Sequence, residues 1–478
     1  MAFTSTSGAG LPPRRVLIVV QNLPVPFDRR VWLEATTLAK AGCAVSVICP
    51  KMKGFNAARE VVEDIAIYRY PLPIDAQGAL GFAAEFAWCL FMTSLLSIRV
   101  ALFGRGFDVL HVCNPPETYW ILGLFWRMLG RVFIFDHHDL SPEMFAAKFN
   151  RPSGLLHRTL LLLEKLTFRV AQVVITTNES HRDVALNRGG KLPGDVYVVR
   201  SGPDLSRFGV KEPCSDWSQG KPFLAAYLGE MCKQDGVDHL VRAMKILRDE
   251  LGKRDVQCVF IGGGPHQPAI AAYAGEIGVL DCCTFLGRVS DEVLCSVLSS
   301  AHVGVDPDPK NDWSDKSTMN KVVEYMFFGL PVLAYDLHET RVSAGAAGSY
   351  ATPNCERALA QGIDRLLREP ESRRRMGQFG HDRVRNALAW TYSVPSLLAA
   401  YDHAFRLKQA SRLHPRGRRG EPAAHDAAAD TTKADLRWST ATAAQWQGRH
   451  RSLEEASSAC PDDADRAMSA VSADKLRP

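Results

Sequence analysis

The sequence contains little that would mark a secreted, metal-binding or nucleic-acid-binding protein. Its twelve cysteines are scattered over 478 residues, and none has the CxxC or Cys/His spacing of a zinc site. The 57 lysines and arginines only slightly outnumber the 52 aspartates and glutamates, so the net charge of +5 is too small to indicate a nucleic-acid partner. We therefore expect a cytoplasmic protein with reduced thiols.

Long apolar runs are also missing. Residues 1–13 are small and polar, unlike a signal peptide, and we expect residues 1–14 to form a flexible amino terminus. The most apolar stretch, residues 86–98, is shorter than the roughly 20 residues that a membrane-spanning helix needs. A helix that is apolar all round is buried in a core or lies on a membrane surface. The short length favours burial, and the membrane surface remains the alternative.

Three common catalytic fingerprints are absent. The first apolar run, residues 16–20, is followed by QNLPVPFDRR and not by the GxGxxG turn of a dinucleotide-binding enzyme. No GxSxG nucleophile elbow stands in a suitable context, and no pair of carboxylates can be assigned to glycosidase chemistry. A dehydrogenase, a hydrolase and a glycosidase are therefore poor interpretations.

What the sequence does contain is a regular alternation of strand and helix patterns. The alternation occurs twice, over residues 16–176 and again over 223–334, on either side of a polar segment at 211–222. It predicts an α/β protein with two doubly wound, Rossmann-like domains that face each other across a cleft. The expected boundaries are 15–205 for the first domain, 206–389 for the second, 390–409 for a final helix and 410–478 for a disordered tail with basic Arg416, Arg418 and Arg419.

The segment 304–341 carries the strongest site signal. A strand ends near Val305, a polar loop follows, and Ser317 or Thr318 can cap the next helix. The amino terminus of a helix offers free N–H groups and a positive dipole end, which suit a diphosphate.

Charged side chains on this helix add to the signal. Lys316 and Lys321 would supply positive charge beside the diphosphate, and Glu324 could accept hydrogen bonds from a sugar diol two turns into the helix. The alternative is a surface helix whose charged side chains are merely solvated.

The same segment resembles the donor-binding region of glycosyltransferase family 4, whose members are retaining enzymes with the GT-B fold. In that family two glutamates are separated by seven residues, and VEYMFFGLPV supplies the second as Glu324, which the resemblance assigns to the nucleotide ribose. The first would fall at Lys316, and Asp315 beside it is a candidate substitute. Several motifs occur in order, so the resemblance extends from about Val16 to Tyr401, and the final helix is expected to pack back on the first domain.

Further motifs lie at expected strand ends of the first domain. FDHHDLSPEM contains His138 and Asp139, which the resemblance places near the reacting carbon of the donor sugar. HVCNPPETYW contains Asn114 and Glu117, which are candidates for contact with the acceptor or a phosphate.

Two arginines, Arg29 and Arg30, stand in PFDRRVWLE where the family has a glycine pair. At a helix start that faces the cleft they could hold a phosphate of the donor or acceptor. The alternative is a pair of solvated surface arginines.

Loops of the second domain resemble the family's nucleotide-binding turns. The first of them carries Glu230 and Asp235 where the family has an arginine and a lysine, so other cations must meet the diphosphate charge. The candidate binding residues are Gly229 and Lys233 in YLGEMCKQDGVD, Gly263 in FIGGGP, and Arg288 and Val289 in LGRVSDE.

The resemblance implies transfer of a sugar from a nucleoside diphosphate sugar to a glycan or lipid-linked glycan, as in exopolysaccharide or other cell-surface glycan synthesis. We expect catalysis to rest on His138, Asp139, Lys316 and Glu324, with fixed cations at the leaving diphosphate and no metal or other cofactor. The apolar helix at 80–103, with arginines nearby, suggests peripheral contact with the inner membrane face. A catalytically silent nucleotide-sugar-binding subunit and an epimerase of the same fold remain alternatives.

Overall fold

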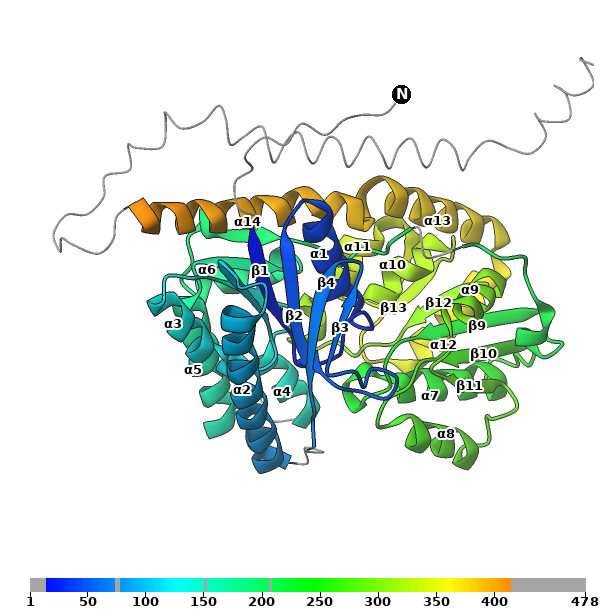
Figure 1. Ribbon diagram of the computed structural model, residues 1–478. Coiled ribbons are helices and arrows are strands. Elements are labelled where there is room, and N and C mark those ends of the chain that lie inside the picture. Colours follow the sequence, from blue (N-terminus) through cyan, green and yellow to red (C-terminus); the bar gives the residue numbers. More distant parts are fainter. Residues whose placement is uncertain (1–13, 74–77, 150–152, 206–208, 414–478) are drawn as a thin grey trace, which may run out of the picture. The chain divides into compact units, whose positions relative to one another are not determined.

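The computed structural model describes residues 14–73, 78–149, 153–205 and 209–413. The expected flexible start and the expected tail with its basic cluster therefore lie outside the described residues, except for residues 14 and 410–413. Two α/β lobes follow each other along the described chain, each built on a twisted sheet flanked by helices (Figure 1). The predicted fold class is confirmed, and the expected boundary near residue 205 falls between the two sheets.

The first lobe contains an eight-stranded sheet with the order β3-β4-β2-β1-β5-β6-β7-β8. Neighbouring strands are parallel except β3 and β4, which form a hairpin around Glu63 and Asp64 in left-handed backbone conformations. Its central strands are buried on both faces, which explains their continuous apolar sequences. The strands are β1 (Arg15–Val19), β2 (Ala44–Pro50), β3 (Arg59–Val62), β4 (Ile65–Tyr70), β5 (Val109–Cys113), β6 (Val132–His137), β7 (Val173–Thr176) and β8 (Val196–Val198).

Helices cover both faces of this sheet. Since β–α–β connections are right-handed, the order of the strands places α2, α3 and α5 on one face and α1 on the other. The helices are α1 (Arg29–Lys40), α2 (Gly78–Phe103), α3 (Trp120–Met128), α4 (Ser141–Phe149), α5 (Leu155–Val170) and α6 (Glu179–Asn187).

The second lobe contains a six-stranded, wholly parallel sheet with the order β11-β10-β9-β12-β13-β14. Two clusters of buried apolar side chains pack against this sheet. The strands are β9 (Phe223–Leu228), β10 (Val256–Ile261), β11 (Cys283–Gly287), β12 (Val303–Asp306), β13 (Val332–Tyr335) and β14 (Gly348–Ala351). The helices are α7 (Val237–Asp249), α8 (Gln267–Glu276), α9 (Asp291–Ser300), α10 (Asn320–Phe327), α11 (His338–Ala344), α12 (Glu356–Arg368) and α13 (Pro370–Arg383).

The last described helix, α14 (Trp390–Leu413), leaves the second lobe and packs on the first (Figure 1). At its start the Trp390 indole donates a hydrogen bond to Thr37 Oγ1 at 2.9 Å. Further along, the hydroxyl of Tyr401 lies 2.7 Å from His111 Nδ1 in the interior of the first lobe. The helix continues four residues beyond the expected end at 409.

The apolar helix α2 differs from expectation. By length and composition its segment Gly81–Phe103 is apolar enough to cross a membrane, and only 22% of the most apolar window is buried. The interpretation as a buried core helix is therefore wrong, because one side of α2 packs on the sheet while its other side carries large exposed apolar side chains.

Candidate active site

The starts of α1 and α10 face each other across the two lobes. Asp28 caps α1 by accepting a hydrogen bond from the Val31 N–H, which places Arg29 and Arg30 in the first turn. A cavity of about 70 Å³ lies between these arginines and residues of α10 that include Glu324. The sequence motifs DRR and VEYMFFGLPV are therefore neighbours in space.

The expected cap of α10 is wrong. The helix begins at Asn320 with Met319 at the N-cap position, and no side chain forms a cap hydrogen bond there. The hydroxyl of Ser317 instead donates to the Trp313 carbonyl, and Thr318 Oγ1 accepts a hydrogen bond from the Asn178 amide. The first N–H groups of α10 thus donate no hydrogen bond to a capping side chain, which keeps this end suitable for an anion.

Glu324 is mostly buried, and it meets Arg29 of the other lobe. One Arg29 nitrogen lies 3.2 Å from Glu324 Oε1, and the second lies 2.7 Å from Asp291 Oδ1. Burial raises the pKa of Glu324 to about 6, and the charge of Arg29 opposes this shift. The carboxylate is therefore ionised at neutral pH and is paired with a cation of the other lobe.

Arg30, by contrast, is engaged inside the first lobe. Its Nη2 lies 3.1 Å from Asp136 Oδ1 and 3.2 Å from Glu34 Oε1, and its Nη1 donates to the Val199 carbonyl at 2.7 Å. Its Nε lies 2.8 Å from His138 Nε2. The guanidinium fixes the surroundings of His138, so this geometry suits a positioning role better than the expected direct contact with a phosphate.

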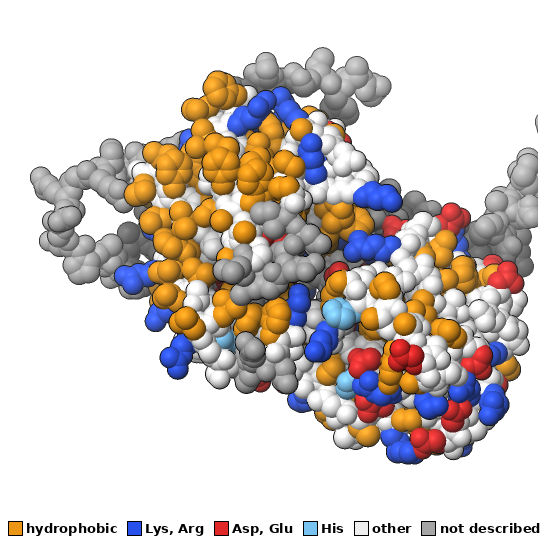
Figure 2. Space-filling view, turned by 90° about the horizontal axis from the view of Figure 1, so that it is seen from below, with side chains coloured by type: hydrophobic (Ala, Val, Ile, Leu, Met, Phe, Trp, Pro, Cys, Tyr) orange, Lys and Arg blue, Asp and Glu red, His pale blue; other side chains and the backbone are white. Residues whose placement is uncertain are grey.

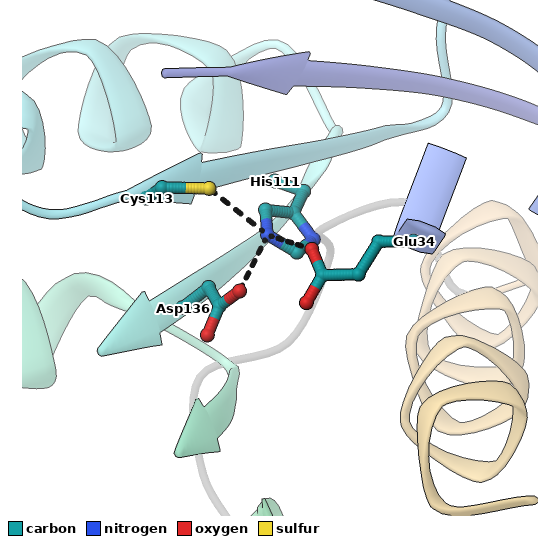
Figure 3. A group of neighbouring side chains, drawn as sticks. All are labelled: Glu34, His111, Cys113 and Asp136. Carbon is teal, nitrogen blue, oxygen red and sulfur yellow. Dashed lines mark hydrogen bonds and ion pairs between the residues drawn. The ribbon is translucent and has the colours of Figure 1, made fainter. Parts of the chain in front are cut away.

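Asp136 is the second partner of His138 and belongs to a fully buried group (Figure 3). Its Oδ2 lies 2.6 Å from His138 Nε2 and 3.3 Å from His111 Nε2. Burial opposes the charge of Asp136, but Arg30 and the two histidines hold its pKa well below the ordinary range. Burial raises the pKa of the neighbouring Glu34 well above its usual value, and the negative charge of Asp136 adds to this shift.

The side chains in Figure 3 have a spacing that a metal ion could use, since the ligand atoms of Glu34, His111, Cys113 and Asp136 lie within 4.8 Å of one another. The Arg30 guanidinium, however, already contacts both carboxylates and supplies the positive charge of the cluster. The residues present therefore fit a buried ion-pair network that orients His138.

Asn114 fixes the loop that carries His138 and Asp139. Its Oδ1 accepts hydrogen bonds from the backbone N–H groups of both residues, at 2.6 and 3.1 Å. Its Nδ2 donates to Glu117 Oε1 and to the Asp139 carbonyl. Asn114 and Glu117 are 2% exposed, so they support the loop from within and do not present polar atoms to an acceptor.

The second lobe has a buried cation of its own. Lys321 Nζ lies 3.2 Å from Asp306 Oδ1 and contacts Asp308 Oδ2. Burial opposes all of these charges, yet the two carboxylates hold the pKa of Lys321 well above its usual value, and Lys321 lowers the pKa of Asp306. Burial raises the pKa of Asp308 well above its ordinary range. Most of the Lys321 charge is therefore compensated within the lobe.

Lys321 lies directly behind the first glycine turn. A Cβ atom at Gly229 would stand 3.3 Å from Lys321 Cε, and one at Gly262 would collide with the Gly229 carbonyl oxygen at 1.8 Å. Both glycines adopt left-handed φ angles, of +157° and +127°. The two turns pack backbone to backbone, and only glycine permits this approach.

The other expected nucleotide-binding residues surround these turns. A Cβ at Gly263 would meet the Arg288 side chain at 3.1 Å, and the Arg288 guanidinium lies over the ring of Phe27 in the first lobe. Val289 packs against the apolar core of the second lobe, whereas Lys233 is exposed. The structure thus gathers Gly229, Gly263 and Arg288 in one region and leaves Lys233 at its solvent side.

Lys316 and Asp315 belong to a separate part of the interface between the lobes. Both line a cavity of about 370 Å³ together with residues of α6 that include Asp183, and with Arg188 directly after that helix. The Lys316 carbonyl accepts a hydrogen bond from Asn178, and Asp315 Oδ1 accepts one from the His338 N–H at the start of α11. Asp315 is therefore engaged with α11, and its role in place of the family's first glutamate stays a prediction.

Sequence reasoning missed the partners that organise these groups. Asp136 lies inside the FDHHD motif, and Glu34 lies four residues after Arg30 on one helix face. That spacing is a recognised ion-pair signal and could have identified Glu34. No local signal indicates Asp306 and Asp308 as partners of Lys321, because the pairing depends on how the loop after β12 folds.

Comparison with known proteins bears on the family of both lobes. A family model described as "Glycosyl transferase 4-like domain" matches residues 28–201, and one described as "Glycosyl transferases group 1" matches residues 222–369. An MMP alpha-(1->4)-mannosyltransferase from Mycolicibacterium hassiacum is 26% identical over 323 residues, which make up 65% of this chain and 74% of that protein.

Solved structures share the two-lobed fold. Sucrose-phosphate synthase from Thermosynechococcus elongatus aligns with a TM-score of 0.65 and 20% identity, over 82% of this chain and 99% of the other. HepE from Anabaena, in complex with UDP-glucose, aligns with a TM-score of 0.60 and 14% identity, over 81% and 99%. Because the two family models match one lobe each and together cover more than half of the sequence, the chain belongs to the family-4 type of glycosyltransferases and has their GT-B fold.

Proposed function

We propose that this glycosyltransferase takes its sugar from a nucleoside diphosphate sugar and transfers it with retention of configuration. The observation that carries the proposal is the position of Glu324, a largely buried carboxylate with a raised pKa that faces Arg29 beside the start of α10. An ionised carboxylate there can accept hydrogen bonds from the two ribose hydroxyls, and the N–H groups at the start of α10 can receive the diphosphate. HepE, which shares the fold, was crystallised with UDP-glucose, and this supports a donor of the same class.

The donor needs more room than the cavity beside Glu324 provides. That cavity measures about 70 Å³, whereas ligand sites for molecules of this size occupy several hundred. Donor binding therefore displaces Arg29 from Glu324, and the released guanidinium can pair with the diphosphate. Lys316, in the turn before α10, lines the separate cavity beside α6 and is not assigned to the diphosphate.

His138 is proposed to contact the donor sugar near the reacting carbon. Its ring is held by Asp136 and Arg30, and its backbone by Asn114, so it needs little reorganisation when the transition state forms. Asp139 follows on the same loop, and burial raises its pKa. Negative charge grows on the leaving diphosphate in this reaction, and fixed cations with the α10 N–H groups stabilise it in place of a divalent metal.

The acceptor is proposed to be a glycan or lipid-linked glycan used in exopolysaccharide or other cell-surface glycan synthesis. The protein would work in the cytoplasm, in peripheral contact with the inner face of the membrane. The long exposed apolar helix α2 supports this part of the proposal.

Two measurements test the proposed function. In a thermal-shift screen over nucleoside diphosphates and their sugars, compounds with one particular base should raise the melting temperature of the protein. Incubation of the stabilising nucleotide sugar with the enzyme should then release nucleoside diphosphate slowly, and faster when acceptor extract is added. Stabilisation without any release would instead favour a silent binding subunit, and conversion of the donor without acceptor would favour an epimerase.

A further inference from the structure

Helix α2 exposes large apolar side chains and buries several small or polar ones. The side that packs on the sheet has Cys89, Thr93 and Ser97 fully buried beside Val100, and Met92 and Leu96 pack partly buried against the same core. The outward side carries Phe91, Leu95 and Leu102, which are 54%, 48% and 69% exposed. A helix on the surface of a water-soluble lobe normally has the opposite arrangement, because burial of apolar side chains drives its packing. The outer side of α2 is therefore built for contact with something apolar.

Two neighbouring helices extend this surface. The Trp126 indole of α3 donates a hydrogen bond to Ser97 of α2 at 3.0 Å, and α3 in turn contacts α5. All three helices lie on one face of the sheet, as the right-handed connections require. We call their outward side the apolar face, which comprises Phe91, Leu95, Ile98 and Leu102 of α2, Ile121, Leu124, Phe125 and Met128 of α3, and Leu155 and Leu162 of α5.

The exposed charged side chains of these three helices are all positive. Arg99 on α2 and Arg158, Lys165 and Arg169 on α5 are exposed. The three helices contain just two acids: Glu164 is 0% exposed and pairs with Arg188, and Glu85 accepts a hydrogen bond from Gln21. Figure 2 shows apolar side chains gathered over the first lobe with cations beside them, whereas the second lobe mixes both signs. An apolar surface bordered by cations complements a lipid bilayer with anionic headgroups.

We infer that the apolar face docks in the plane of an anionic lipid bilayer, with its leucine and phenylalanine side chains below the headgroups and its cations among them. Because one side of α2 is packed against the sheet, the helix lies on the membrane and does not cross it. Docking of this face would bring the enzyme to a lipid-linked acceptor, and this biological role rests on the proposed function. The docking itself does not, because the surface is defined without reference to the reaction.

Vesicle flotation of the full-length protein tests this docking. The protein should float with vesicles of phosphatidylglycerol and phosphatidylcholine in equal parts, and much less with phosphatidylcholine alone. The double variant Leu95→Glu/Leu102→Glu should bind the anionic vesicles at least tenfold more weakly, because two charged groups would have to enter the apolar layer. The variant Arg99→Gln/Arg169→Gln should lose several-fold on the anionic vesicles only.

A matched control comes from the second lobe. Leu280 and Val342 are also exposed but lie outside the apolar face, so Leu280→Glu/Val342→Glu should float like the unmodified protein. The docking is wrong if the protein binds neither vesicle type, or if the apolar-face variant and the control bind equally. It is also wrong if light scattering without lipid shows a dimer that only Leu95→Glu/Leu102→Glu dissociates, because the face would then join two copies. The donor thermal shift should be unchanged in every variant, so loss of flotation with an intact shift separates this inference from the proposed chemistry.

Discussion

Arg30 in the first lobe and Lys321 in the second both lie among buried carboxylates near the cleft, and the two arrangements differ in connectivity. Arg30 contacts Asp136 and His138 around the end of β6, Glu34 on its own helix and the Val199 carbonyl after β8, so it joins three segments of the first lobe. Lys321 contacts Asp306 at the end of β12 and Asp308 just after it, and lies over the Tyr227 ring. A planar guanidinium can hold several groups at fixed angles, whereas an ammonium acts as a point charge. We infer from this comparison that Arg30 fixes the relative positions of its partners, whereas Lys321 compensates the charge of the carboxylates beside it.

The largest effect is expected from Arg30→Met. It leaves the ionised Asp136 buried without its main partner, which should reduce the free energy of unfolding by about 3–5 kcal/mol in urea denaturation. Donor turnover should fall strongly because His138 loses one of its two ring contacts. Arg30→Lys is the informative companion: it keeps the charge, so it should recover much of the stability but little of kcat. Full recovery of kcat by lysine would contradict the distinction between the two cations.

A smaller effect is expected from Lys321→Met. The free energy of unfolding should decrease by about 3 kcal/mol at neutral pH, because Asp306 stays buried without its cation. The pKa of Asp306 is lowered in the folded protein, so its contribution is present above the unfolded pKa and is lost as the pH falls below about 4. The difference between the variant and the unmodified protein should therefore shrink in acid-range denaturation curves. A difference that is independent of pH would mean that Asp306 is not the group Lys321 stabilises.

Glu324→Gln should chiefly affect donor binding. Loss of the charged acceptor should raise the donor KM about tenfold, which corresponds to about 1.4 kcal/mol, with little change in stability. Because burial raises the pKa of Glu324 to about 6, donor affinity of the unmodified enzyme should weaken as the pH falls through 6, where the carboxylate takes up a proton. The glutamine variant should show a flat profile over the same range. Identical profiles would mean that the ribose binds elsewhere.

Arg29→Ala should have the smallest effect on stability. Its ion pairs are partly exposed, so the free energy of unfolding should change by less than about 1 kcal/mol. Arg29 opposes the upward shift of the Glu324 pKa, so its removal should move the midpoint of the donor-binding profile above pH 6. Arg374→Ala, at an exposed arginine paired with Glu371 far along the second lobe, is the control and should leave the midpoint in place.

The fold was largely predictable because alternating apolar runs are a strong local signal. Both sheets follow from it, apart from the antiparallel hairpin of β3 and β4, and β1 was expected within one residue of its position. The orientation of α2 was not predictable, since a helix that is apolar on all sides has no pattern that distinguishes its inner side from its outer side. Its small polar residues can face inward because their hydroxyls are satisfied there: Thr93 donates to the Cys89 carbonyl of the same helix, and Ser97 accepts a hydrogen bond from Trp126 of α3.

The sequence predicted which residues belong to the candidate site better than it predicted how their side chains are arranged. The motifs placed Arg29, His138 and Glu324 near the cleft, and the structure brings α1 and α10 together. It could not be foreseen that Arg30 turns inward while Arg29 crosses to Glu324, because adjacent residues of one helix differ by about a quarter turn and their roles depend on tertiary packing. The capping error at Ser317 has a similar cause, since the Trp313 carbonyl competes for that hydroxyl.

The packing of α14 on the first lobe affects how the protein folds during its synthesis. Tyr401 reaches His111 in the interior of the first lobe, and Asp402 pairs with Arg14 at 2.6 Å beside the first strand. The segment that completes the earliest-translated half of the enzyme therefore leaves the ribosome after the whole second sheet has been synthesised. Until then the surface of the first lobe that α14 covers stays exposed. Nascent chains arrested before codon 401 should therefore be substrates for chaperones and proteases.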